Sequence, residues 1–133
     1  MKKILLLFLL LPFIGISQAL SGNYIIKSTN ATPFNTLTNA VARINSVGAA
    51  GPVVFLLDDT TYSNTTGETF PIIITQFTGT SATNTLTIKP NIGKTVTITA
   101  TNRNSFTGVP AVIEFNGADN IIVDGNNSTG TTR

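Results

Sequence analysis

The chain has 133 residues, of which 41% are hydrophobic and 11% are charged, and it contains neither histidine nor cysteine. The absence of these two residue types excludes thiol nucleophiles, disulfide bonds, Ser-His-Asp triads and the usual zinc sites. The chain has eight Lys and Arg residues and six Asp and Glu residues. Because no basic run is present that would follow a phosphate backbone, we expect no nucleic-acid partner.

The first 19 residues have the three parts of a secretory signal peptide. Met1-Lys2-Lys3 is a basic start, residues 4–16 form an apolar core, and Ser17-Gln18-Ala19 is a small-x-small cleavage site. The apolar run of about 13 residues is shorter than the roughly 20 that span a bilayer. We therefore expect cleavage after Ala19, export without stable membrane insertion, and a formally neutral mature segment.

After the leader, the sequence predicts one short strand and one helix. The strand is a β-like run over residues 23–27. From Pro33 to Val47 the apolar residues recur at steps of three and four, which places them on one helical stripe. Thr32 is the predicted N-cap, Pro33 the first helical residue and Gly48 the residue that stops the helix.

From Pro52 onward, short runs rich in β-branched residues predict strands separated by clusters of Gly, Asn, Asp, Ser and Pro. These runs cover residues 53–57, 70–75, 85–88, 95–99, 112–115 and 121–123. Their spacing varies along the chain rather than repeating at a fixed period.

Two all-β architectures fit such a pattern. A sandwich needs antiparallel hairpins with two-residue turns, and the one Asn-Gly dipeptide, Asn116-Gly117, continues into residues 118–120 rather than reversing at once. A right-handed parallel β-helix needs short strands that alternate inward apolar and outward polar residues. The segments 85–88 and 95–99 alternate in this way, with Val96 and Ile98 inward.

A β-helix also exposes the edge of its first coil, which must be covered to prevent end-to-end pairing. The amphipathic helix before the first strong strand is a natural cover, whereas a sandwich leaves it unexplained. We therefore predict an all-β fold, a right-handed parallel β-helix with an N-terminal capping helix. The expected organisation is a signal peptide over 1–19, a strand and capping helix over 20–51, and the first β-helix coils over 52–133, truncated at the C-terminus.

Several segments carry a family likeness: residues 33–37 with Ala40-Val41, residues 51–55, Tyr62, residues 79–88 and residues 119–125. Together they resemble the opening of large right-handed β-helix surface proteins of Gram-negative bacteria, which belong to the pectin-lyase-like fold group. The resemblance implies export, further repeats, a C-terminal sorting domain for type IX secretion and an adhesive or glycan-facing role. This sequence shows only the first coils of that pattern, so the cell surface, secretion and the periplasm all stay open.

The enzymes of this fold group hold calcium with acidic residues on an outward strand face. The corresponding candidates are Glu114 and Asp124, with Asp119 in the turn between them. Calcium takes six to eight oxygen ligands, and this corner offers three carboxylates with Asn116 and Asn120 nearby. In the alternative reading, Asp and Asn satisfy the turn backbone and Glu114 is a solvated strand residue. We assign no catalytic residue and no cofactor.

Asp58 and Asp59 are adjacent carboxylates that would point to opposite faces of a strand, so they are interpreted as a strand exit. The Thr-x-Thr segments at 85–87 and 95–99 match an ice-binding pattern, although threonine is also a good exposed strand former. Several aromatic side chains are candidates for either a sugar platform or the core: Tyr24, Tyr62, Phe70, Phe77 and Phe106.

The leading functional hypothesis is a non-catalytic N-terminal segment of an exported β-helix protein that mediates adhesion or contacts polysaccharides or cell-surface glycans. The alternative is the N-terminal part of a polysaccharide lyase or hydrolase of the β-helix type, truncated before its active site. A third possibility is a short secreted module that pairs its open β edge with a partner, including another copy of itself.

Overall fold

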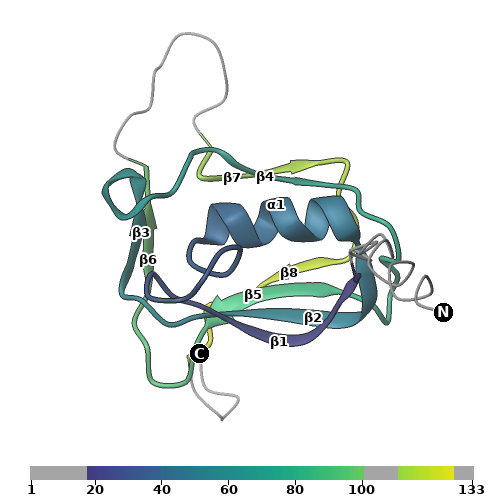
Figure 1. The fold of residues 1–133 in the computed structure, drawn as a ribbon, viewed down its shortest axis with the longest axis horizontal. Coiled ribbons are helices and arrows are strands. Elements are labelled where there is room, and N and C mark those ends of the chain that lie inside the picture. Colours follow the sequence, from purple (N-terminus) through teal and green to yellow (C-terminus); the bar gives the residue numbers. More distant parts are fainter. Residues whose placement is uncertain (1–17, 101–110, 128–133) are drawn as a thin grey trace, which may run out of the picture.

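The computed structural model describes residues 18–100 and 111–127 (Figure 1). The predicted signal peptide, apart from Gln18 and Ala19, lies outside the described residues. No helix in the described part of the chain is long and apolar enough to cross a membrane. The elements in chain order are β1 (Leu20–Ile26), α1 (Leu37–Val47), β2 (Ala49–Leu57), β3 (Thr61–Ser63), the short 3-10 helix η1 (Asn64–Thr66), β4 (Ile72–Thr75), β5 (Leu86–Pro90), β6 (Thr97–Thr99), β7 (Ile113–Asn116) and β8 (Ile121–Val123).

The strands form three parallel sheets. One has the order β1-β2-β5-β8, and the other two are the pairs β3-β6 and β4-β7. The chain passes through the three sheets in the order β2, β3, β4, repeats that order with β5, β6, β7, and then returns to the first sheet at β8. The expected all-β character with parallel strands is therefore confirmed.

Alternation along the strands places apolar side chains in the space between the sheets. Val53, Phe55 and Leu57 on β2 are buried, as are Leu86 and Ile88 on β5. The parallel register stacks these positions, so that Val53 lies beside Leu86 and Phe55 beside Ile88. Apolar residues one strand apart thus form continuous ladders, which bury more surface than any single coil could.

The ladders end in partly exposed residues at the last strands. Val123 is aligned with buried Ile88, and Phe115 is aligned with buried Ile74. Both occupy core-facing register positions, yet Val123 is 56% exposed and Phe115 is 52% exposed. The molecule therefore has an apolar open face at β7 and β8.

The helix α1 lies across the space between the four-stranded sheet and the β4-β7 pair (Figure 1). Its buried residues are Leu37, Ala40, Val41 and Ile44, and they belong to the same core cluster as the inward residues of β2 and β4. This apolar stripe is the one that the sequence spacing predicted. The helix covers the apolar interior where it packs against β1, β2 and β4.

The predicted start of the helix is wrong by four residues. The N-cap is Thr36, whose side chain accepts the N–H of Asn39 at 3.1 Å, and not Thr32. Residues 31–34 instead form a turn in which the Phe34 N–H donates to the Ala31 carbonyl at 3.1 Å. At the other end, Gly48 stops the helix as expected, with φ of 76° and its N–H bonded to the Ile44 carbonyl.

The sequence runs also misplace parts of the strands. β2 begins at Ala49, so the expected boundary between residues 51 and 52 falls inside it, and Pro52 is accommodated where the β1–β2 register shifts. The strand β3 was not predicted, because three residues with a single apolar side chain, Tyr62, carry no usable period. β4 and β6 begin two residues later than the runs at 70–75 and 95–99 suggest.

Candidate functional site

Three strands of the largest sheet, β1, β2 and β5, end side by side, and each strand of the sheet is followed by a polar residue. Lys27 follows β1, Asp58 follows β2, Asn91 follows β5 and Asp124 follows β8. The N–H groups of Asp58, Asn91 and Asp124 each donate to a carbonyl of the neighbouring strand at 2.8–3.1 Å. The ladder thus continues one residue past β1, β2 and β5 and aligns Lys27, Asp58 and Asn91, which we call the polar column. Asp124 lies beside Lys89 instead, because Val123 is paired with Ile88.

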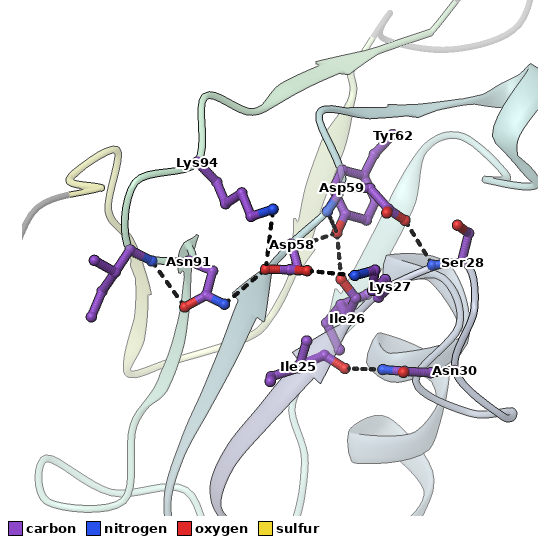
Figure 2. A network of polar contacts seen from close by, with 11 residues as sticks. Ile25, Ile26, Lys27, Ser28, Asn30, Asp58, Asp59, Tyr62, Asn91 and Lys94 are labelled. Atoms are coloured by element: carbon purple, nitrogen blue, oxygen red, sulfur yellow. Dashed lines mark hydrogen bonds and ion pairs between the residues drawn. The ribbon is translucent and has the colours of Figure 1, made fainter.

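Asp58 is the centre of the polar column (Figure 2). Its carboxylate accepts the Asn91 amide at 2.9 Å, lies 3.0 Å from the Lys27 ammonium and lies 3.7 Å from the Lys94 ammonium. The hydrogen bond from Asn91, followed by that from Lys27, holds the pKa of Asp58 below its ordinary value. The Asp58 side chain is only 12% exposed, so this ionised group ties the ends of three neighbouring strands together.

The adjacent Asp59 and Tyr62 fix the turn that follows β2. One Asp59 carboxylate oxygen accepts the Ser28 N–H at 2.6 Å. The Tyr62 hydroxyl donates to the Ile26 carbonyl at 2.6 Å and accepts the N–H of Asp58 at 3.1 Å, and burial raises the pKa of Tyr62 to about 12. The predicted strand exit at Asp58-Asp59 is confirmed, since β2 ends at Leu57.

A groove of about 840 Å³ lies beside the polar column. It is lined by residues 23–25 of β1, by residues 29–34, and by Lys27 and Asp58. Tyr24 and Phe34 stack within it, with ring centroids 4.5 Å apart and planes 23° apart, and both rings pack edge-on against buried Phe55. The two rings are half-buried, so each presents some surface to the groove.

Polar groups surround this aromatic pair. Asn30 donates its side-chain amide to the Ile25 carbonyl at 2.7 Å, which holds it at the groove (Figure 2). Asn23 and Thr32 are exposed lining residues. The groove is wide and largely open to solvent, so it offers aromatic surface and a few fixed polar groups rather than an enclosed pocket. The groove is the best candidate for a functional site in the described part of the chain.

The structure does not gather the three candidate metal ligands into one site. Glu114 is exposed on β7, whereas Asp124 follows β8, which belongs to a different sheet. Asp124 lies 3.8 Å from the Lys89 ammonium and accepts the Asn126 N–H at 2.9 Å. Among the described residues no group of three or more acidic side chains could hold a metal ion.

The physical reason is the corner between β7 and β8, which turns the chain from one sheet to another. Asn120 takes a positive φ of 61° there. Asp119 is exposed, and its N–H donates to the Gln76 side chain at 3.0 Å. The corner thus fits the reading in which Asp and Asn serve the turn backbone.

The predicted aromatic candidates separate into two groups. Tyr62 and Phe77 are core residues, 2% and 4% exposed, and Phe70 is packed against the core. Tyr24 lines the groove, whereas Phe106 lies outside the described residues. Sequence reasoning missed Phe34, the partner of Tyr24, because apolar spacing assigns Phe34 to the helical stripe.

The two Thr-x-Thr segments lie on different sheets. Thr87 is on β5 in the four-stranded sheet, and Thr97 is on β6 in the β3-β6 pair. They therefore do not form the single flat threonine array that ice binding requires. Thr97 is exposed while Ile98 packs against the core, which agrees with the predicted alternation of this strand.

Comparison with known protein families gives a match over most of the chain. A family described as "Protein of unknown function (DUF1565)" matches residues 20–132. The chain belongs to the DUF1565 family. DUF1565 domains are associated with parallel β-helix proteins, and the three parallel sheets of this DUF1565 chain are consistent with that association. No curated protein and no solved structure matches the chain significantly.

Proposed function

We propose that the chain forms the N-terminal coils of an exported right-handed parallel β-helix protein and contacts glycans through the groove beside the polar column. Three features support the architecture: the repeated order of strands through three parallel sheets, the stacked apolar ladders and the helix packed against β1, β2 and β4. The family association points in the same direction. The role is adhesion or glycan contact without catalysis, at the cell surface or in the secreted or periplasmic fraction.

The observation that carries the glycan role is the stacked pair Tyr24 and Phe34 at the groove. Sugar rings have apolar C–H faces and a rim of hydroxyl groups, so they match aromatic surface bordered by amide and hydroxyl side chains. Asn30 and Asn23, which also line the groove, supply such groups. A groove lined by uniformly apolar side chains would not provide this combination.

Binding of the mature chain, residues 20–133, to a broad array of neutral and acidic glycans tests the proposal. We expect specific binding to at least one class, weakened by about tenfold or more when a ring at the binding surface is removed in Tyr24→Ala. Phe115→Ala is a matched control, because it removes an exposed aromatic ring on β7 that does not line the groove. Absence of binding to every glycan on the array would contradict the proposed role.

The export part of the proposal has its own test. The leader pattern predicts that the full chain, expressed in a Gram-negative host, is processed between Ala19 and Leu20. Mass spectrometry of the exported protein measures the new N-terminus. An unprocessed chain retained in the cytoplasm would contradict export.

A further inference from the structure

The charged side chains around the groove neutralise one another. Lys27 and Asp58 are the two charged residues among those that line it, and their ammonium and carboxylate groups are 3.0 Å apart. Just outside, Lys94 lies 3.7 Å from the same Asp58 carboxylate, and Asp59 accepts the Ser28 N–H. Two cations and two carboxylates leave this corner formally neutral.

An acidic sugar would meet an unfavourable environment in such a groove. The Lys27 ammonium is already engaged by Asp58, so a uronate or sulfate would have to compete with an internal carboxylate for it. The Asp58 carboxylate itself, fixed by the Asn91 amide at 2.9 Å, would repel the incoming anion. Displacing Lys27 would also leave a poorly exposed carboxylate with one fewer partner.

The uncharged features of the groove suit a neutral sugar. Tyr24 and Phe34 provide the apolar surface, and Asn23, Asn30 and Thr32 provide uncharged donors and acceptors. Hydroxyl groups exchange hydrogen bonds with such side chains in either direction. Neither interaction depends on a net charge on the ligand.

We propose that this groove selects neutral saccharides over acidic ones. The inference rests on the proposed glycan-binding function and narrows its ligand class to hexose or pentose chains that carry no uronate or sulfate. The ligand ring packs on Tyr24 and Phe34, while its hydroxyl groups bond to the amides at the rim. The ion pair between Lys27 and Asp58 remains intact when the ligand binds, so the Lys27 ammonium is not available to an anionic ligand.

The test compares oligogalacturonate with its fully methyl-esterified form, in which each carboxylate is replaced by an uncharged ester, together with neutral glucan, mannan and xylan oligosaccharides. Calorimetric titration of residues 20–133 should show at least one neutral ligand bound about tenfold or more tightly than any acidic one. Its affinity should change little with ionic strength, because no charge on the ligand is screened. Amide shifts mapped by NMR should fall on residues 23–25 and 29–34.

A charge variant sharpens the test. Asp58→Asn keeps the shape of the side chain but leaves Lys27 and Lys94 without their carboxylate, so it should gain measurable affinity for oligogalacturonate. Asp119→Asn makes the same change in net charge at an exposed position remote from the groove, and it should gain none. Circular dichroism establishes that both variants are folded before they are titrated.

The outcomes separate this inference from the proposed function. Binding of acidic ligands by the unsubstituted chain, as tightly as of neutral ones, overturns neutral selection while glycan binding stands. Failure of every saccharide, neutral or acidic, overturns both. Neutral binding with amide shifts located elsewhere on the chain overturns the assignment to this groove.

Discussion

The buried carboxylate of Glu68 accepts the backbone N–H of Leu37 at 2.8 Å, although 31 residues separate the two in sequence. The second Glu68 oxygen accepts the N–H of Thr38 at 2.7 Å. These N–H groups belong to the first turn of α1, where no helical carbonyl is available to them. A negative charge at this position also interacts favourably with the helix dipole. Through these hydrogen bonds, Glu68 links the N-terminus of α1 to the segment that precedes β4.

Substitution of Glu68 should therefore destabilise the fold well beyond an average surface change. Glu68→Ala removes two backbone hydrogen bonds and one from the Thr38 hydroxyl to a charged group, and it leaves buried donors unpaired, for an expected loss of about 2–4 kcal/mol in the free energy of unfolding. Glu68→Gln retains one acceptor oxygen and should lose less. Urea denaturation of residues 20–133 measures the difference. Glu114→Gln, at an exposed position on β7, is the control and should change little.

Asp58 gives the chain a defined sensitivity to acid. Its pKa is lowered in the folded protein, first by the Asn91 hydrogen bond and then by Lys27, from an ordinary value of 3.8. A carboxyl group of this kind contributes stability that is fully present above its unfolded pKa and is lost as the pH falls through the lower folded value. The contribution of Asp58 should therefore disappear as the pH drops below 3.8.

The measurement is the free energy of unfolding at neutral pH and at a series of acidic pH values. Asp58→Asn should be less stable at neutral pH and should show a flatter pH dependence below 3.8 than the unsubstituted chain. Asp119→Asn should follow the unsubstituted chain throughout. Equal slopes for Asp58→Asn and the unsubstituted chain would show that the carboxylate is not held by its partners.

Much of the fold follows from sequence because its strands carry their own signals. The β-branched runs around Val53, Ile72 and Leu86 mark inward faces, and the spacing of Leu37, Val41 and Ile44 marks the helix face. The start of the helix could not be read in this way. Besides the local cap Thr36, it depends on Glu68, which is 31 positions away from the Leu37 N–H that it accepts.

The candidate site could not be predicted from the sequence because its residues, too, come from distant parts of the chain. Asn91 and Asp58 are 33 residues apart, and Asp59 and Ser28 are 31 apart. Without a fixed repeat length, the sequence does not show that these residues follow adjacent strands. The three acidic candidates at 114, 119 and 124 are close in sequence, but the corner between β7 and β8 separates two of them onto different sheets.

The parallel register between β2 and β5 can be tested by engineered disulfides, since the chain has no cysteine of its own. Val54 lies opposite Thr87, and neighbouring Cα atoms on paired strands are about 5 Å apart, within the range that a disulfide spans. The double variant Val54→Cys/Thr87→Cys should oxidise rapidly and completely.

The control shifts the second cysteine by two residues to Val54→Cys/Lys89→Cys. The Cα atoms are then about 8 Å apart, beyond disulfide reach. Non-reducing electrophoresis and thiol titration distinguish the two. Faster oxidation of the shifted pair would contradict the register.

Gly79 lies where the chain leaves β4 and passes close to the start of β2. Its φ is 85°, and a Cβ atom there would lie 1.9 Å from the Ala49 carbonyl oxygen. Gly79→Ala should therefore lose about 2 kcal/mol or more, combining backbone strain with displacement of a neighbouring strand. Gly93 has a φ of 74° with open space around it, so Gly93→Ala isolates the strain alone. Similar thermal midpoints for the two variants would contradict the close approach.

The apolar open face at β7 and β8 predicts a tendency to self-associate. Phe115 and Val123 are more than half exposed although their register positions face the core. Within residues 18–100 and 111–127, β8 is the last strand of its sheet on this side. An edge strand with exposed apolar neighbours is a template for pairing with another chain. Sedimentation velocity of residues 20–133 should show association that increases with concentration.

Replacing apolar surface on that face should weaken the association. The double variant Phe115→Ser/Val123→Thr removes apolar area and keeps Thr as a good strand former. The control is Ile25→Thr, which removes a side chain that is 48% exposed on β1, the edge strand at the opposite end of the same sheet. We expect the double variant to shift toward monomer and Ile25→Thr to behave as the unsubstituted chain. If Ile25→Thr abolished association and the double variant did not, the contact would lie at β1. If the unsubstituted chain were monomeric at every concentration, the exposed apolar residues would not drive pairing.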